Sequence, residues 1–190
     1  MPLNLDVLLI NIEDFSNFRD ISVNTDADRL NALIREAQIR EIRSFLGDAL
    51  YFAMIQDYTP VPNDEGTFTE QRFTDLWYGV AWVKNSFTIQ LQGLKPAHVY
   101  YSYERFLYQN KLNVTRYGDR VLQDNDFSEN LVTTKKYEVS ADSMGLVYQF
   151  DAKDYIEENP DLFPEYNNPE IKREINTGWK FMKIGRLIGR

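Results

Sequence analysis

The stretch PAHVYYSYERFLYQNK, residues 96–111, decides the fold of this chain. Pro96 suits the first turn of a helix, because the N–H that proline lacks would have no intrahelical partner there. The aromatic side chains spread around the whole helix instead of forming one stripe; they are Tyr100, Tyr101, Tyr103, Phe106 and Tyr108. A helix that is apolar on every side is either central in its fold or contacted by another subunit. We therefore predict a helix from Pro96 to about Lys111 that is either central in the fold or a contact with another subunit, and we take these aromatics as candidate subunit or partner contacts.

The single histidine, His98, falls in the first turns of this helix. Histidine changes its charge near neutral pH, so it could serve as a general base. No partner for that role is visible in the sequence, and we expect a packed or interfacial histidine.

A long helical segment from about Asp26 to Ile55 precedes the central helix. Asn24 and Thr25 are good N-cap residues. Apolar residues form a broad stripe at helical spacing: Leu30, Leu33, Ile34, Ala37, Ile42, Phe45, Leu46, Ala49 and Leu50. Gly47 interrupts this stripe, which predicts a break or kink.

Shorter elements follow. Residues 69–78 predict a second helix that ends at Gly79. The apolar period then changes to the alternation of a strand over residues 80–91. Since residues 84–86 form a plausible turn, we predict a β-hairpin that ends at Gly93.

The last predicted helix spans roughly Thr134 to Asn159, and Pro160 stops it. Its apolar face repeats every three or four residues: Tyr137, Ala141, Met144, Tyr148, Ala152 and Tyr155. Residues 115–130 between the central and last helices read as a loop with one short strand.

These elements predict a mainly α fold, a small antiparallel bundle of about four helices with an inserted β-hairpin. We divide the chain into an N-terminal arm (residues 1–23), a helical domain (residues 24–164) and a basic C-terminal arm (residues 165–190). The N-terminal arm has too little apolar area for a core of its own. The basic C-terminal arm carries six Lys/Arg and three Glu, a net charge of +3, which leaves −11 on residues 1–164.

Apolar and basic residues interleave in the basic C-terminal arm. The large apolar ones are Trp179, Phe181, Met182, Ile184, Leu187 and Ile188. Their number is too high for a solvated tail. The pattern indicates a segment that orders on a partner, either an acidic protein groove or nucleic acid, and we favour protein.

The composition excludes many kinds of site. The chain has 190 residues, 29 Asp and Glu against 21 Lys and Arg, a net charge of −8, no Cys and one His. A disulfide framework, a thiolate zinc site and a multi-His metal centre are therefore excluded. No common phosphate-binding, nucleophile or metalloprotease motif occurs. We predict no catalytic, cofactor-binding or metal-binding residues, and a protein that is not an enzyme.

Segments that would direct the chain into or across a membrane are not recognisable. No window approaches the ~18 apolar residues of a transmembrane helix. The N-terminus lacks the basic region of a secretion signal. We expect synthesis in a reducing cytoplasm and no membrane partner.

Several motifs follow the predicted elements in order: Ile21–Asp26, Phe45-Leu46-Gly47-Asp48-Ala49-Leu50-Tyr51, Leu76-Trp77-Tyr78-Gly79, Gly93-Leu94-Lys95, Tyr100–Phe106, Thr115–Gly118, Tyr155–Asn159 and Phe163-Pro164. With these motifs, the order of elements resembles head–tail connector proteins of tailed bacteriophages, in particular the ring proteins of crAss-like and related Bacteroidetes phages. The resemblance covers roughly residues 21–166.

What this resemblance implies is a structural virion protein at the head–tail junction, made in the host bacterial cytoplasm. Such protomers usually assemble as a dodecameric ring below the portal, which joins the portal to the tail and extends the DNA channel. The implied partners are copies of the chain itself, the portal protein, adjacent connector or tail rings, and genomic DNA that passes through the lumen without specific binding. No catalytic residue comes with the family.

The acidic domain suits such a channel, because carboxylates repel the phosphates that Lys and Arg would bind. We expect acids of the polar loop to face the lumen, and the candidates are Asp124, Asp126 and Glu129.

Two alternatives remain open. A DNA-binding or packaging accessory would act through the basic C-terminal arm. A carboxylate- or metal-dependent hydrolase would use paired acids such as Asp151 and Asp154, and this is the weaker alternative, because spacing alone does not place two acids across a cleft.

Overall fold

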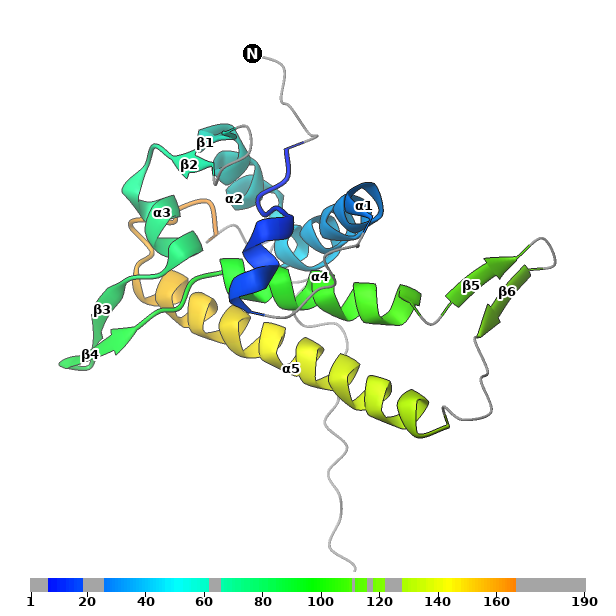
Figure 1. Ribbon diagram of the computed structural model, residues 1–190. Coiled ribbons are helices and arrows are strands. Elements are labelled where there is room, and N and C mark those ends of the chain that lie inside the picture. The colour runs from blue at the N-terminus through cyan, green and yellow to red at the C-terminus, as the bar shows by residue number, and fades with distance from the viewer. Residues whose placement is uncertain are drawn as a thin grey trace, which may run out of the picture.

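The computed structural model describes residues 7–18, 26–61, 66–110, 112–115, 118–121 and 128–166. Over this part of the chain the fold is mainly α-helical with inserted β-hairpins, as predicted (Figure 1). The helices are α1 (Ala27–Ala37), α2 (Ser44–Asp57), α3 (Gln71–Tyr78), α4 (Lys95–Asn110) and α5 (Ser128–Glu158). The antiparallel strand pairs are β1 (Tyr58–Thr59) with β2 (Thr67–Phe68), β3 (Ala81–Lys84) with β4 (Phe87–Gln90), and β5 (Leu112–Thr115) with β6 (Gly118–Val121).

The central helix is α4, which is one of the two explanations that the sequence left open for its apolar circumference. It runs antiparallel along α5 and also packs against α1 (Figure 1). Tyr100 stacks on Tyr148 of α5, with 5.8 Å between the ring centroids. Tyr101 lies against Gly145 of α5, where an added Cβ would come within 2.7 Å of the tyrosine ring. The missing side chain at Gly145 therefore lets the two helices approach closely.

The long N-terminal helical segment is divided in two. A π-helical segment, η2 (Gln38–Arg43), connects α1 to α2. Within α2 the predicted kink is present at Gly47, whose φ of 74° and ψ of 162° are non-helical. A left-handed φ costs glycine little because it has no Cβ. The chain can thus turn here while Leu46 and Leu50 on either side stay buried.

The start of α1 differs from the predicted N-cap by one residue. The Asp26 carboxylate accepts hydrogen bonds from the backbone N of Asp28 at 3.0 Å and of Arg29 at 3.5 Å. Aspartate is as good a cap as asparagine and better than threonine, so sequence preference does not separate these neighbours. Asn24 and Thr25 lie outside the described residues.

Residues 112–115 and 118–121 form an antiparallel strand pair where we expected a loop with one strand. β5 and β6 pair in the register Leu112↔Val121 to Thr115↔Gly118. Gly118, Asp119 and Arg120 of β6 offer no alternation of apolar and polar residues, so the pattern did not mark this segment as a strand. The two longer hairpins extend from opposite ends of the α4–α5 pair (Figure 1).

α5 begins at Ser128, six residues before the predicted start, and ends at Glu158 next to the predicted end. The apolar periodicity that marks this helix starts only at Tyr137, so the polar first turns gave no signal. Pro160 follows the helix, where its ring and missing N–H prevent continuation.

Residues 7–18 pack on the helical domain instead of forming a separate arm. Leu9, Ile10 and Phe15 are buried. The Gln38 side chain accepts from the backbone N of Leu9 at 3.0 Å and donates to the carbonyl of Val7 at 3.0 Å. A side-chain amide from another element thus replaces the backbone partners that this short segment lacks. Sequence patterning shows the apolar residues but not this distant amide.

None of the helices within the described residues combines the length and apolar character needed to cross a membrane.

Candidate functional site

The predicted β-hairpin is formed by β3 and β4, paired from Ala81↔Gln90 to Lys84↔Phe87. Its turn residues, Asn85 and Ser86, both have positive φ, 50° and 70°. Positive φ at both central residues is the mark of a type I′ turn, whose twist matches the twist of the two strands that it joins. Asparagine tolerates the left-handed conformation better than most residues, which favours the turn at this position.

Side-chain contacts with α5 hold the hairpin against the bundle. The Trp82 ring meets the Tyr155 ring edge-on, with 5.4 Å between centroids. Two residues further along β3, on the same face, Lys84 Nζ lies 2.6 Å from Asp154 Oδ2. The β3 side of the hairpin is therefore anchored to the last turns of α5.

The rest of the hairpin leaves large apolar side chains exposed. Phe87 is 73% exposed, Val83 is 66% exposed, and Ile89 is also exposed. Single exposed apolar residues are ordinary, but several close together mark an interaction surface. Phe87 and Ile89 lie on one face of the hairpin, whereas Val83, paired with Thr88, lies on the other. We call the side chains of Phe87 and Ile89 the hairpin surface.

A second exposed apolar surface lies on α5. Val139, Leu146, Val147 and Phe150 are all exposed, with Phe150 at 63% and Val147 at 50%. At 100° per residue these four side chains share the side of α5 opposite Ala141 and Ala152, which are buried toward the bundle. We call these four residues the outer face of α5.

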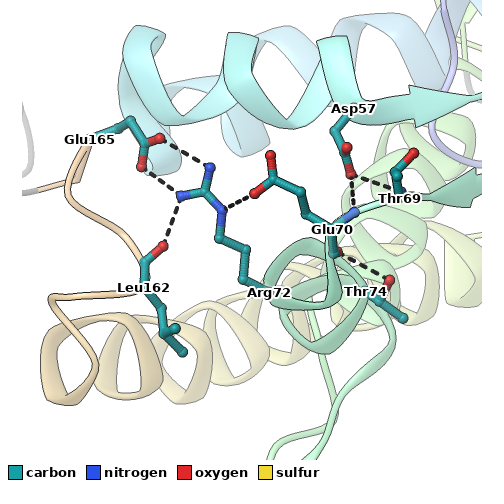
Figure 2. A network of polar contacts seen from close by, with 7 residues as sticks. All are labelled: Asp57, Thr69, Glu70, Arg72, Thr74, Leu162 and Glu165. Carbon is teal, nitrogen blue, oxygen red and sulfur yellow. Dashed lines mark hydrogen bonds and ion pairs between the residues drawn. The ribbon is translucent and has the colours of Figure 1, made fainter.

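Arg72 of α3 connects the segment after α5 to the domain (Figure 2). Its guanidinium donates to both carboxylate oxygens of Glu165, at 2.9 and 3.1 Å, and to the carbonyl of Leu162 at 2.7 Å. The Nε atom donates to Glu70 at 2.6 Å, and the guanidinium carbon lies 4.3 Å from the Phe73 ring centroid. A planar guanidinium suits this multidentate geometry. The chain is therefore held at a defined place up to Tyr166.

A side chain of α2 holds the backbone that leads into α3. Asp57 accepts hydrogen bonds from the backbone N of Thr69 at 2.9 Å and of Glu70 at 2.8 Å (Figure 2). These N–H groups precede the helix and would otherwise lack a partner. The contact fixes α3, and with it Arg72, relative to α2.

A cavity of about 320 Å³ lies between the N-terminal segment, α1 and β1. Asp14 and Lys95 line it, and their side chains form a buried ion pair with Lys95 Nζ 2.6 Å from Asp14 Oδ1. The Lys95 ammonium also lies 5.4 Å from the Tyr78 ring centroid. Asp14 and Lys95 thus pair with each other within the chain, and the ion pair attaches the N-terminal segment to α4.

A second charged cluster joins η2 to α4. Arg105 Nη2 donates to Glu41 Oε1 at 2.6 Å, and Arg105 Nε lies 3.6 Å from Glu36 Oε1. Burial raises the pKa of Glu41, and the hydrogen bond from Arg105 opposes that shift. The geometry is that of an interhelical ion pair.

His98 is a packed histidine, one of the two expected outcomes. It is fully buried, and its Nε2 lies 3.1 Å from the carbonyl of Ile34, so Nε2 carries the proton and donates. The ring meets Trp77 edge-on, with 5.9 Å between centroids. Burial lowers the pKa of His98 to about 4, so the ring is neutral at neutral pH.

The structure divides the predicted aromatic contacts of α4. Tyr100 and Tyr101 are buried within the chain, Tyr103 and Phe106 are half-buried against the core, and Tyr108 is exposed. Of these five, Tyr108 has the most surface to offer a partner. The central position of α4, which the sequence left as one of two explanations, accounts for the others.

Other predicted site residues lie outside the residues whose side chains are described. The basic C-terminal arm contributes Trp179, Phe181, Met182, Ile184, Leu187 and Ile188, and the polar loop contributes Asp124 and Asp126. Glu129 lies in the first turns of α5, not in a loop, and its side chain is not described. The channel-facing role of these acids stays a prediction.

Sequence reasoning missed the outer face of α5. The buried stripe of this helix was recognised, but its second apolar set recurs at residues 139, 146, 147 and 150, a spacing of seven, eight and eleven from the first. That spacing is also helical, so it could have been found. The sequence does not show which of two stripes faces the core.

Among the described residues, no three or more His, Asp or Glu side chains are grouped so that they could hold a metal ion. Asp151 and Asp154 both lie on exposed turns of α5, and Asp154 pairs with Lys84.

No curated protein and no solved structure matches this chain. A family of unknown function, DUF6712, matches residues 42–175, from the end of η2 through α5 and into the C-terminal arm. Since this match spans well over half of its length, the chain belongs to the family of unknown function DUF6712.

Proposed function

We propose that this protein is a structural virion component, a head–tail connector that forms a ring below the portal of a tailed phage. The hairpin surface is the observation that carries this proposal. Phe87 is the most exposed large apolar side chain described, and it lies beside Ile89 on a hairpin that projects from the bundle.

A projecting apolar hairpin is suited to subunit contact. Complete burial of a Val or Phe side chain stabilises an association by roughly 1.5–3 kcal/mol relative to leaving it in water. In a ring each copy presents one surface to a different surface of its neighbour, and rotation closes the set. The hairpin surface of one copy would serve as such a contact to the next.

The order of elements and the charge distribution support the same function. The resemblance to connector ring proteins covers most of the helical domain, including the hairpin that ends at Gly93. The charge of −11 on residues 1–164 suits the wall of a channel through which DNA slides, because carboxylates repel phosphate. The ring would contact the portal on one side and the next connector or tail ring on the other.

Phe87→Asp tests the hairpin contact. We expect the wild-type protein to form rings with a central hole, alone at high concentration or on the portal protein encoded by the same genome, and the variant to form none. A charge at this position would have to be buried unpaired in the contact. Light scattering after size exclusion and negative-stain microscopy measure the outcome.

Thr88→Asp is the matched control, because Thr88 is exposed on the opposite face of the same strand. Both variants should unfold at the same temperature as the wild type. Rings that survive Phe87→Asp, or a wild-type chain that binds neither itself nor the portal, would overturn the proposal.

A further inference from the structure

We propose that the end of the basic C-terminal arm, residues 179–188, docks on the outer face of α5 of its own chain. This inference is independent of ring formation. It concerns a surface and a segment that the proposed hairpin contact does not use.

The outer face of α5 is an exposed apolar surface on a helix whose opposite side is buried against the bundle. Tyr155 and Ile156 are buried on the bundle side, whereas Val147 and Phe150 stay half or more exposed. Val139 and Leu146 extend the apolar surface toward the N-terminal part of the helix. Such a set of large side chains on one face is typical of a surface that another segment covers.

The charges around this face complement those of the arm. From residue 139 to the end of α5 the carboxylates are Asp142, Asp151, Asp154, Glu157 and Glu158, with Lys153 as the one basic residue. Residues 179–190 carry Lys180, Lys183, Arg186 and Arg190 and no acid. An apolar segment interleaved with cations therefore meets an apolar face flanked by anions, which favours this pairing over contact with a neutral or basic surface.

The starting point of the arm brings it within reach of its own α5. Arg72 and Glu165 hold the chain beside the end of α5, and Tyr166 is buried with its ring 6.3 Å from that of Phe45. Twelve residues, 167–178, lie between Tyr166 and Trp179, and the thirteen Cα–Cα steps span up to ~45 Å when extended. The outer face begins about 12 Å along the helix axis from Glu158, at 1.5 Å per residue. The connecting residues can therefore reach it with slack.

This short connection favours the chain's own arm over that of a second copy. A tethered segment has an effective concentration in the millimolar range, whereas separate copies in dilute solution are micromolar. The arm of the same chain therefore occupies the outer face of α5 before the arm of another copy does. The apolar residues of the arm and those of the outer face are then removed from water together.

Engineered cysteine pairs test the docking, because the chain contains no cysteine of its own. Val147→Cys and Phe150→Cys are each combined with Ile184→Cys or Leu187→Cys in the full-length protein. We expect at least one pair to form an intrachain disulfide in dilute solution under mild oxidation. It would be seen as a faster-migrating monomer band on a non-reducing gel.

Thr88→Cys combined with Ile184→Cys is the matched control, since Thr88 is exposed on the hairpin and outside both apolar surfaces. The control pair should form its disulfide at least ~10-fold more slowly than the best pair on the outer face of α5, because the tethered arm would meet Thr88→Cys only by random encounter. Equal rates for all pairs would overturn the proposal. So would mixed single-cysteine proteins that yield an interchain product as readily as the double variants yield the intrachain one, because the occupant would then be a second copy.

The fluorescence of Trp179, taken as the difference between wild type and Trp179→Phe, gives a second readout. We expect emission shifted to the blue, as for an indole removed from water, and a return toward the red in Phe150→Asp. Phe87→Asp should leave this emission unchanged, which separates failure of docking from failure of ring assembly. Emission typical of exposed indole, or one that shifts only when duplex DNA is added, would overturn the proposal.

Discussion

At the scale of single residues, burial determines the chemistry more than residue type does. The one histidine of the chain could titrate near neutral pH, but His98 is fully buried and donates to the Ile34 carbonyl. Burial lowers its pKa to about 4 from an ordinary value of 6.5. A group with this shift stabilises the fold above pH 6.5 and loses that contribution as the pH falls toward 4, because the unfolded chain then binds the proton more tightly.

We expect the free energy of unfolding to fall by ~2 to 3 kcal/mol between pH 7.5 and 4.5 through His98 alone. Urea denaturation at both values of pH measures the loss. His98→Gln keeps an amide N–H that can donate to Ile34 but has no titration in this range. The difference in free energy of unfolding between wild type and variant should therefore shrink at low pH. A difference that stays constant with pH would show that the histidine is not buried as neutral imidazole.

At the scale of elements, the direction of the β3–β4 hairpin depends on the glycine that follows it. Gly93 has a φ of 84°, and an added Cβ would lie 2.3 Å from the carbonyl oxygen of Trp77. This backbone atom belongs to α3 and cannot move aside like a flexible side chain. The close crossing of the two segments places the hairpin relative to α3 and α4.

Gly93→Ala should therefore destabilise the protein by ~2 kcal/mol or more, since it adds both a clash and a left-handed φ. Gln92→Ala is the control, because Gln92 is the exposed neighbour. Thermal unfolding followed by circular dichroism measures both. Equal midpoints of thermal unfolding for the two variants would show that the segment at Gly93 can move away from the end of α3 without loss of stability.

At the scale of the whole molecule, ion pairs join segments that are distant in sequence. Lys95 and Asp14 attach the N-terminal segment to α4, and both side chains are nearly inaccessible to water. Removing one partner of a buried pair leaves the other charge in a poorly solvated place. Loss of the pair therefore weakens the attachment of the whole N-terminal segment to α4.

Asp14→Asn should cost ~3 kcal/mol of unfolding free energy, because it removes the carboxylate from a buried ammonium. The double variant Asp14→Asn with Lys95→Met should recover much of this loss, since it removes the second charge as well. Urea denaturation of the two single variants and the double variant gives the coupling between the residues. Losses that simply add would show that the two side chains do not depend on each other.

Local signals determine much of the fold. The kink at Gly47, the hairpin turn before Phe87 and the end of α5 before Pro160 each depend on residues within a few positions. Backbone conformation and apolar period are local properties, so the sequence predicts them. Tertiary structure decided which side of a helix is buried, and it placed residues 7–18 on the domain through Gln38 and Lys95.

The candidate site shows the same division. The sequence alone showed an acidic chain without cysteine, with interleaved apolar and basic residues at its end. Of the two apolar stripes of α5 only the one that contains Tyr155 was predicted, and the packing against α4 decided that Tyr155 lies inside while Phe150 lies outside. Burial depends on contacts between segments far apart in the chain, and no local pattern of residues contains that information.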